Sequence, residues 1–473
     1  MKLNGKFVGL ISAVLILSML ITPVFGQTEP SAIENDHSAE QTVYGCFSAD
    51  ATDSYLGSEQ LVKNAKSVFL YELNTRTVMY AWQPDIAQPP SSFVKILTAI
   101  VAIENGNLDS AVTVTESVLA DLPASAVSVN LIANEVLTLQ DLLYCLLVGS
   151  GNDAAVVIAQ HVAGSQAAFV EMMNDLSEKI GCNGSNFVNV HGLHDPQQIT
   201  TARDTVKILE YAMKNETFRT IFSATEYTVA ASNKSPERHL ITGNYMMSAE
   251  EVEIYLDERV TGGRTGVSSD GTRCLATVAK SGTMELLCVV MGAASVYEEG
   301  GNRIRSFGGY NETKTLLDKG FEGNSAFQIL YDGQALIQYD VENGDSLLTV
   351  GPRANVSTIL PKDVLLADLD LRYSEDGRNL RAPVAPGEKV CSVEIWHQGL
   401  LLTATDLFAM NEVRDKSVIS EYQPENRNAW MAVLIVVIVS ILILAIVLLT
   451  RTHFGRRFIQ RIHRPRVKRK RRR

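Results

Sequence analysis

The sequence contains no C-x-x-C pair, no recognisable spacing of metal-ligating side chains and no internal repeat of significant length. These absences argue against zinc-ribbon sites and solenoid folds, and we expect neither a metal nor a cofactor. The six cysteines lie between residues 46 and 391. Cys274 and Cys288 fall on two consecutive predicted strands and are the one pair we consider for a disulfide. Cys145 lies in an apolar helical stretch, where a buried free thiol is expected.

Charge is absent from residues 430–450, which are rich in Val, Ile and Leu. At about 1.5 Å per residue, a helix of this length crosses a hydrocarbon core of about 30 Å. Residues 451–473 hold 12 Lys and Arg and no Asp or Glu. Basic residues beside a span stay on the cytoplasmic side, so the sequence predicts a transmembrane helix, a cytoplasmic tail and a large external region.

The opposite end of the chain has the pattern of a secretory signal. Residues 1–26 combine Lys2 and Lys6 with an apolar run over Phe7–Ile21 and small residues near Gly26. The alternative is a retained anchor helix, although the apolar run is short for a span. Residues 27–60 are polar and acidic, which predicts a flexible lead-in.

Net charge is distributed unevenly along the chain. The whole sequence carries −11, so the part outside the basic tail is strongly acidic. We expect the tail to set membrane topology and to attract anionic lipid, and we expect no nucleic-acid partner.

The chain is longer than a domain with a single hydrophobic core usually is, so we expect two folded domains with appendages. Residues 61–320 pass from strands to clustered helices and back to strands, which is typical of an α+β domain. Apolar residues on nearly every face predict a buried helix from Ser92 to near Gly106. Strands are predicted at Ser67–Leu73, Thr77–Tyr80, Arg273–Ala279 and Met284–Met291. Helices are predicted at Thr138–Leu147, Asp153–Val162 and Gln166–Ile180.

Residues 325–414 have a different pattern, with short alternating runs separated by Gly, Pro and Asp. Such runs predict a small all-β domain. Examples are Leu347–Val350, Val364–Leu371 and Val390–Trp396. Residues 415–429 form a polar linker to the predicted membrane helix.

Ser92 and Lys95 lie three residues apart in the predicted buried helix and therefore on one of its faces. A serine hydroxyl is a weak nucleophile that needs a nearby base. Burial lowers the pKa of a lysine, so a neutral Lys95 amine can accept the Ser92 proton. The free N–H groups at a helix start can also stabilise an oxyanion. Taken alone, the pair is far more often an N-cap serine beside a solvated lysine than a catalytic pair.

Two further motifs carry polar groups suited to the same chemistry. Ser150 and Asn152 lie in a short break between two apolar helices, where they can point a hydroxyl and a carboxamide into a cleft. Residues 263–266, Gly-Arg-Thr-Gly, can open a strand whose edge pairs with an extended peptide. Arg264 and Thr265 can bind a terminal carboxylate there. Taken separately, these motifs are more typical of an ordinary turn and of a glycine-rich hairpin connection.

The three motifs in this order, Ser-x-x-Lys, Ser-x-Asn and basic-Thr-Gly, form the signature of penicillin-binding proteins and serine β-lactamases. The sequence around them resembles the D-alanyl-D-alanine carboxypeptidases, the low-molecular-mass penicillin-binding proteins. The resemblance covers most of residues 65–320 and continues more faintly through the β-rich region. It is carried by residues 90–98, 139–155, 187–195, 201–204 and 271–279.

The resemblance implies an α+β catalytic domain of the penicillin-binding and serine β-lactamase type, followed by a small all-β domain. It implies Ser92 as nucleophile, Lys95 as general base and Ser150 as proton relay, with an acyl-enzyme formed on a peptidoglycan stem peptide and D-alanine released. Penicillins, which mimic the substrate, are expected to acylate Ser92. The substrate-binding residues would be Asn152, Arg264, Thr265, Gly266 and Val267, with the backbone N–H groups of Ser92 and Val267 holding the oxyanion.

Two departures from the family pattern leave alternatives open. Arg264 stands where the family usually has lysine, and arginine cannot give up its proton. The predicted span also differs from the amphipathic C-terminal helix of many relatives. The alternatives are a serine β-lactamase and a catalytically silent, membrane-tethered peptidoglycan-binding scaffold. No glutamate that could direct a deacylating water was found after Ser150-Gly-Asn152.

Overall fold

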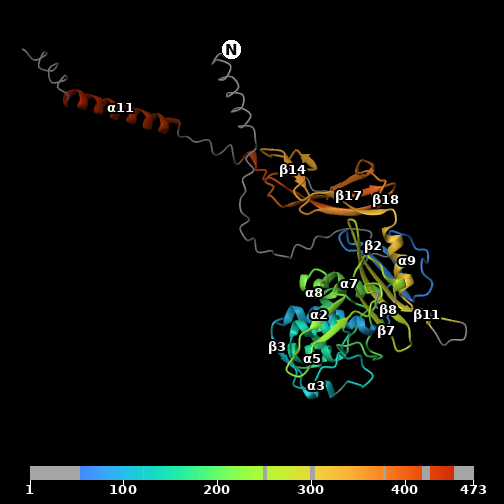
Figure 1. The fold of residues 1–473 in the computed structure, drawn as a ribbon. Coiled ribbons are helices and arrows are strands. Elements are labelled where there is room, and N and C mark those ends of the chain that lie inside the picture. The colour runs from blue at the N-terminus through green and yellow to red at the C-terminus, as the bar shows by residue number, and fades with distance from the viewer. Residues whose placement is uncertain are drawn as a thin grey trace, which may run out of the picture. The chain divides into compact units, whose positions relative to one another are not determined.

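The computed structural model describes residues 54–120, 122–248, 253–298, 304–375, 380–417 and 427–451. The predicted signal at 1–26, most of the lead-in and the basic tail beyond residue 451 lie outside the described residues. Figure 1 shows a mixed α/β body at residues 54–321, followed in the chain by an all-β region.

A five-stranded antiparallel sheet in the order β2-β1-β9-β8-β7 forms the centre of the first body. Strands that are far apart in the sequence meet in this sheet, because β1 pairs with β9 along the whole length of β1. The strand pairs predicted near the start and the end of this domain are both present. The sheet consists of β1 (Ser67–Glu72), β2 (Thr77–Trp82), β7 (Val260–Val267), β8 (Arg273–Ser281) and β9 (Met284–Ala293).

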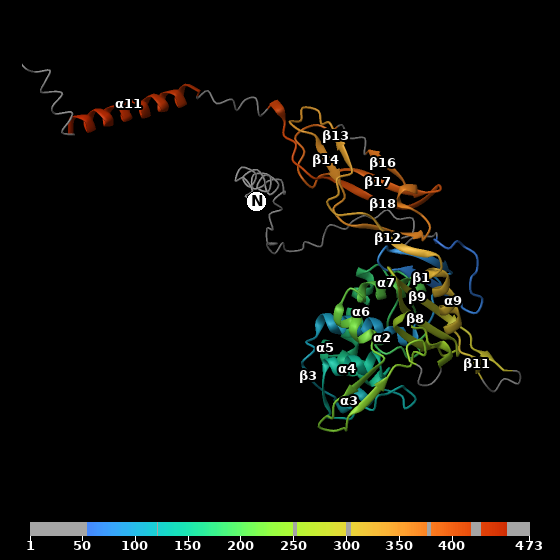
Figure 2. The same ribbon diagram turned by 45° about the horizontal axis from the view of Figure 1, so that its top comes forward.

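Alternate side chains of the sheet face two separate cores. Phe69 and Tyr71 of β1 pack into the core shared with a cluster of helices, whereas Val68 and Leu70 pack into the core shared with α9. Figures 1 and 2 show α9 apart from the other helices across the sheet. The helices are α2 (Val94–Asn105), α3 (Glu116–Ala120), α4 (Leu139–Leu147), α5 (Asn152–Ala163), α6 (Gln166–Lys179), α7 (Ala202–Ala212), α8 (Glu216–Phe222) and α9 (Tyr310–Phe321).

Local sequence determines several helix starts. The Thr138 side chain accepts from the backbone N–H of Asp141 while the Asp141 carboxylate accepts from Thr138 N, and together these bonds form a capping box. The predicted helix from Ser92 begins instead with a 3₁₀ turn, η1 (Ser91–Phe93), before α2. Short strand pairs flank the helices: β3 (Ala111–Thr113) with β4 (Val136–Thr138), and β5 (Glu226–Val229) with β6 (Arg238–Ile241).

The all-β region contains a second five-stranded sheet in the order β13-β14-β18-β17-β16 and a two-stranded pair, β12-β15. Its own core includes Leu348, Val350, Val393 and Leu407. Figure 2 shows these strands together. They are β12 (Asn324–Leu330), β13 (Ile337–Tyr339), β14 (Leu348–Gly351), β15 (Val356–Pro361), β16 (Asp370–Glu375), β17 (Lys389–His397) and β18 (Leu400–Ala409).

One predicted strand is wrong over most of its length. The run Val364–Leu371 forms a 3₁₀ turn, η3 (Leu366–Asp368), and only its last residues enter β16. The Asp368 carboxylate accepts from the backbone N–H of Leu365 and stabilises the turn. This local side-chain bond competes with strand formation.

The considered disulfide between Cys274 and Cys288 is also wrong. Both thiols are free, and they lie in the two cores on opposite faces of the sheet. The register pairs Cys288 with Thr277, three residues from Cys274, so the two side chains cannot face each other. Cys145 is a buried free thiol, as expected.

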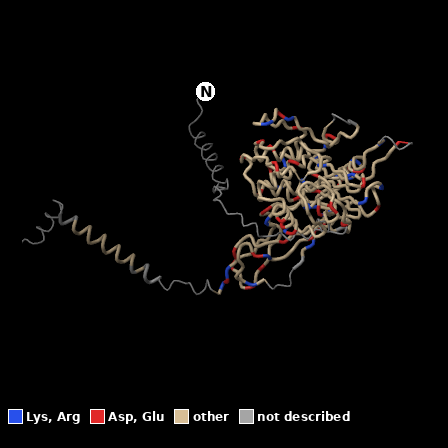
Figure 3. Tube along the Cα trace, turned by 90° about the horizontal axis from the view of Figure 1, so that it is seen from below, with Lys and Arg blue, Asp and Glu red and all other residues tan. Residues whose placement is uncertain are grey.

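The last described element is α11 (Arg427–Arg451). Its described side chains between Met431 and Val447 are largely exposed and apolar, and Figure 3 shows no charged residue along the middle of the helix. Within the described residues, no helix meets the length and apolarity required to cross a membrane. The span at 430–450 therefore stays a prediction.

Candidate active site

The first feature of the candidate site is the turn that carries Ser92. Ser91, which follows Pro89 and Pro90, has a φ of 48°, an unusual conformation for a residue other than glycine. Ser92 is half-buried in η1, immediately before α2. Gly192 packs so closely that a Cβ there would lie 1.9 Å from the carbonyl oxygen of Ser91. The turn is therefore fixed by contact with a distant loop as well as by its own sequence.

Lys95 points back along α2 to Ser92. Only 1% of Lys95 is exposed, its Nζ lies 3.4 Å from Ser92 Oγ, and it donates to the carbonyl oxygen of His191 at 2.7 Å. Burial is the main reason that the pKa of the ammonium falls well below its ordinary 10.5, and the nearby charge of Arg264 lowers it further. A neutral amine beside a serine hydroxyl can act as its base.

Ser150 and Asn152 lie at the break between α4 and α5. Ser150 has a φ of 61°, and Asn152 is the first residue of α5 with 4% of its surface exposed. The Asn152 Oδ1 atom is buried and has no hydrogen-bond partner among the described residues. An amide oxygen left unpaired in this way costs stability, which is typical of a group kept for a ligand.

Asp153 holds this break in shape. Its carboxylate accepts from Ser128 Oγ at 2.5 Å and from the backbone N–H groups of Val129 and Leu131. It also accepts from Ala154 N at the start of α5. The residues at 128–131 are thereby tied to the helix that begins with Asn152.

Arg264 extends from β7 to the same break. The guanidinium donates through Nη1 to the carbonyl oxygen of Leu147 at 2.7 Å and through Nη2 to Ser150 Oγ. It is 5% exposed, and burial lowers its pKa to about 10, so it remains charged near neutral pH. Its Nε is buried without a partner among the described residues. The Arg264 guanidinium was expected to bind a substrate carboxylate, but two of its nitrogens donate to Leu147 O and Ser150 Oγ of the protein.

Thr265, Gly266 and Val267 lie on the outer edge of the sheet, because β7 pairs only with β8 in the described part of the chain. The Val267 carbonyl accepts from Ser91 Oγ at 2.8 Å. In an antiparallel strand the N–H and C=O of one residue point to the same side, so Val267 N–H also faces η1. A Cβ on Gly266 would lie 3.1 Å from Ser92 N, and the absence of a side chain lets the two backbones meet.

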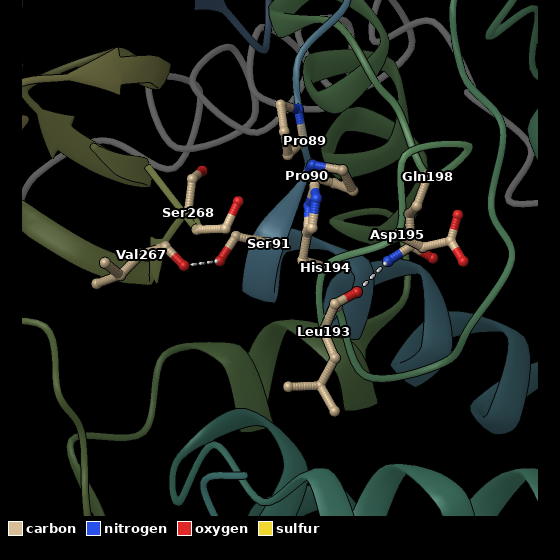
Figure 4. A pocket seen from close by; sticks show the side chains of 11 residues that line it. Pro89, Pro90, Ser91, Leu193, His194, Asp195, Gln198, Val267 and Ser268 are labelled. Carbon is tan, nitrogen blue, oxygen red and sulfur yellow. Dashed lines mark hydrogen bonds between the residues drawn. The ribbon is translucent and has the colours of Figure 1, made fainter. Parts of the chain in front are cut away.

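A pocket of about 230 Å³ lies beside this junction. Figure 4 shows it between the Pro89–Ser91 segment, the loop at 192–198 and the end of β7, with the Ser91–Val267 hydrogen bond at its border. Its lining mixes the apolar Leu193 with the polar His194 and Asp195. The pocket is lined by Ser91 and Val267 but not by Ser92, so it adjoins the candidate site without containing the nucleophile.

Sequence reasoning missed several residues that shape the site. Ser91 falls within residues 90–98 and Asp153 at the start of the predicted helix Asp153–Val162, and neither was assigned a role in the site. His191 and Gly192 fall in the segment Val190–His194 that carried part of the family resemblance. The glycine itself was the available sequence signal, since glycine permits positive φ and close approach of the backbone, and Gly192 has a φ of 88°.

Comparison with known proteins agrees with this geometry. The family model described as D-alanyl-D-alanine carboxypeptidase matches residues 56–295, just over half of the chain. The chain belongs to the D-alanyl-D-alanine carboxypeptidase family. The matched range contains every predicted site residue, from Ser92 to Val267. The resemblance seen in the sequence is confirmed, and the chain is a serine peptidase.

Individual members of the family match over most of their length. D-alanyl-D-alanine carboxypeptidase DacA of Haemophilus influenzae is 28% identical over 381 residues, which cover 79% of this chain and 91% of that protein. D-alanyl-D-alanine carboxypeptidase of Streptomyces sp. strain K15 is 30% identical over 258 residues, or 50% of this chain and 85% of that protein. The crystal structure of penicillin-binding protein 5 from Haemophilus influenzae has a TM-score of 0.65 and 28% identity, and the match covers 76% of this chain and all of that one. The predicted α+β catalytic fold is confirmed.

Proposed function

We propose that this chain removes the terminal D-alanine from peptidoglycan stem pentapeptides through an acyl-enzyme on Ser92. One observation carries the assignment of roles: Lys95 is almost fully buried, its pKa is lowered, and its Nζ lies 3.4 Å from Ser92 Oγ. The family supports the carboxypeptidase reaction, and the three motifs supply the groups it needs.

Acylation begins when the Ser92 proton passes to Lys95 Nζ and Ser92 Oγ bonds to the carbonyl carbon between the two D-alanines. The carbonyl oxygen becomes an oxyanion, which the N–H groups of Ser92 and Val267 stabilise by hydrogen bonds. Ser150 passes a proton to the departing amine and takes up in its place the proton that Lys95 had accepted, the C–N bond breaks, and D-alanine leaves. Water then attacks the ester, and Ser92 regains its proton.

The remaining site residues hold the peptide. The backbone edge at Thr265–Val267 is suited to pairing with an extended peptide, and Gly266 allows close approach. The Asn152 carboxamide is available to a peptide amide group. Arg264 provides fixed positive charge near the substrate carboxylate, while its bond to Ser150 leaves the Ser150 proton free for transfer.

Penicillins are the expected inhibitors of this site. Their strained lactam carbonyl would be attacked by Ser92 in place of the peptide carbonyl, and the leaving amine stays attached to the adduct. The similarity to penicillin-binding protein 5 supports this assignment.

The catalytic region is proposed to lie outside a bacterial cell membrane, with α11 as a single-pass anchor and the basic tail in the cytoplasm. An exposed apolar surface along Met431–Val447 is costly in water and favourable in lipid. The test is membrane extraction at high pH: the chain should stay in the membrane pellet, and replacing both Val437 and Ile441 by Arg should release it. Release of the unaltered chain would contradict the anchor.

The activity is tested on the full-length chain in detergent. It should release D-alanine from a stem pentapeptide and be labelled covalently by fluorescent penicillin, and Ser92→Ala should lose both. Ser281→Ala, which changes an exposed serine at the end of β8, is the matched control and should keep both. Folded protein that shows neither activity, or a Ser92→Ala variant that retains both, would overturn the proposal. Rapid hydrolysis of the bound penicillin would instead indicate a β-lactamase.

A further inference from the structure

Ser91 combines two unusual features. Its backbone has a φ of 48°, a left-handed conformation that side chains other than those of Gly, Asn and Asp rarely adopt. Its side chain is buried, and its hydroxyl donates to the carbonyl oxygen of Val267 at 2.8 Å. Strained backbone persists where the surroundings fix it, and it gathers at functional sites.

The hydrogen bond of Ser91 joins the two peptide segments that carry the oxyanion donors. The Ser91 carbonyl carbon is bonded directly to Ser92 N, the first donor. The second donor, Val267 N–H, belongs to the same residue as the carbonyl that accepts from Ser91 Oγ, and it points to the same side of β7. Ser91 therefore connects one donor to the other through a single side chain.

Gly192 and Gly266 both pack closely against Ser91. A Cβ on Gly192 would lie 1.9 Å from the Ser91 carbonyl oxygen, and a Cβ on Gly266 would lie 2.9 Å from Ser91 Oγ. Neither backbone could approach so closely with a larger residue. The glycine contacts limit how η1 can move, and the hydroxyl fixes its position along β7.

We propose that Ser91 is a positioning residue that sets the spacing between the Ser92 and Val267 N–H groups. This inference rests on the proposed function, since it requires these two groups to hold the oxyanion. Because the oxyanion exists only during bond formation and cleavage, Ser91 acts on the transition state and leaves ground-state binding largely unchanged. Removing one oxyanion donor costs about 10²–10³ in rate, so loosening the spacing should cost about 10- to 100-fold.

The hydroxyl could have the opposite effect if it competed with the substrate for the Val267 carbonyl. A peptide pairing with the β7 edge would donate to that same carbonyl. The two roles predict opposite results for Ser91→Ala: positioning predicts a lower kcat, whereas competition predicts a lower KM with kcat preserved.

The experiment uses the full-length chain with Ser91→Ala, Ser91→Gly and Ser91→Cys, and Ser281→Ala as the matched control, because Ser281 is exposed at the end of β8 far from Val267. The first two variants remove the hydroxyl, and glycine also removes the backbone strain. Cysteine keeps a weaker donor. D-alanine release gives kcat and kcat/KM, and a peptide boronic acid measures transition-state affinity, because its tetrahedral adduct with Ser92 directs an oxygen at the two N–H groups.

The expected result is an equal fall of kcat and kcat/KM, by about 10- to 100-fold, in Ser91→Ala and Ser91→Gly. Boronate affinity should fall by a similar factor, Ser91→Cys should be intermediate and Ser281→Ala unchanged. If Ser91→Ala does not fold, Ser91→Gly decides. Full activity of the hydroxyl-free variants, or a change in KM alone, would overturn the inference while leaving Ser92 as the nucleophile. Activity that survives Ser92→Ala would instead reject the proposed function itself.

Discussion

Arg264 Nη1 donates a 2.7 Å hydrogen bond to the carbonyl oxygen of Leu147, the last residue of α4. Through Nη2 the same guanidinium donates to Ser150 Oγ. The sheet edge is thereby joined to the helix break that carries Ser150 and Asn152. A guanidinium bonds two acceptors from separate nitrogens in a fixed plane, whereas a lysine has one nitrogen on a flexible stem. The departure from the usual family residue therefore has a structural role.

Arg264→Lys should lower kcat/KM for D-alanine release by roughly 10-fold, because the loss of one contact of about 1–2 kcal/mol loosens Ser150. Steady-state assays on the full-length chain measure the effect. Arg273→Lys is the control, since Arg273 lies on the adjacent strand and stacks on Phe307. A lysine variant as active as the unaltered chain would show that the two-nitrogen contact is dispensable.

Arg264→Gln should shift the pH dependence of acylation. The positive charge of Arg264 lowers the pKa of Lys95, so its removal raises that pKa. Lys95 must be neutral to accept the Ser92 proton, and a higher pKa makes it protonated over more of the pH range. The rising limb of the penicillin acylation rate should therefore move to higher pH. The pKa of Lys95 in this variant should still stay below 10.5, because burial, which is the larger cause of the lowered pKa, remains. A limb that does not move, or moves to lower pH, would contradict the coupling.

Asn152→Ala should separate activity from stability. The buried Oδ1 has no partner among the described residues, so its removal should leave the Tm unchanged or slightly higher. Loss of a substrate contact should lower kcat/KM by about 10- to 100-fold. Asn174→Ala is the matched control: its carboxamide donates to Phe187 O and accepts from Phe187 N. This control should lower the Tm and largely keep activity, and a fall in Tm for both variants would argue against a ligand role for Asn152.

Gly192→Ala should be far more damaging than Gly164→Ala. Both glycines have positive φ, 88° and 77°, so both alanines carry a backbone cost of about 1 kcal/mol. A Cβ on Gly192 would clash with the Ser91 carbonyl oxygen at 1.9 Å, whereas a Cβ on Gly164 would meet no atom within 4 Å. Penicillin labelling should be lost in Gly192→Ala and kept in Gly164→Ala, with a larger fall in Tm for the first. Similar behaviour of the two variants would show that the contact between Gly192 and Ser91 does not support the site.

Local patterns were sufficient to predict much of the framework. The three-residue spacing of Ser92 and Lys95 put them on one helical face, and the structure has them in contact. The capping box at Thr138 and Asp141 depends on neighbouring residues alone and is present. The orientation of Arg264 could not be predicted in the same way, because its acceptors lie more than a hundred positions away in the sequence.

The wrong predictions also depend on information that a local pattern lacks. Whether Cys274 and Cys288 face the same side of the sheet depends on the register of β8 against β9, which the sequence does not specify. The run Val364–Leu371 alternates well enough for a strand, but the Asp368 carboxylate closes a turn on Leu365 N. Ser91 gives no local signal, since its positive φ depends on packing against Gly192.

The open edge of β7 carries a hazard beyond catalysis. A strand edge that accepts a substrate backbone can equally accept a strand from another molecule, which is a common route to aggregation. The strand Val-Thr-Gly-Gly-Arg-Thr-Gly-Val has three glycines and a charge, a composition with low intrinsic strand propensity. Under the proposed function, a short peptide anchored by Ser92 and Arg264 would use this edge, whereas a free strand gains little from it. The glycines of β7 therefore help to keep its open edge from pairing with a strand of another molecule.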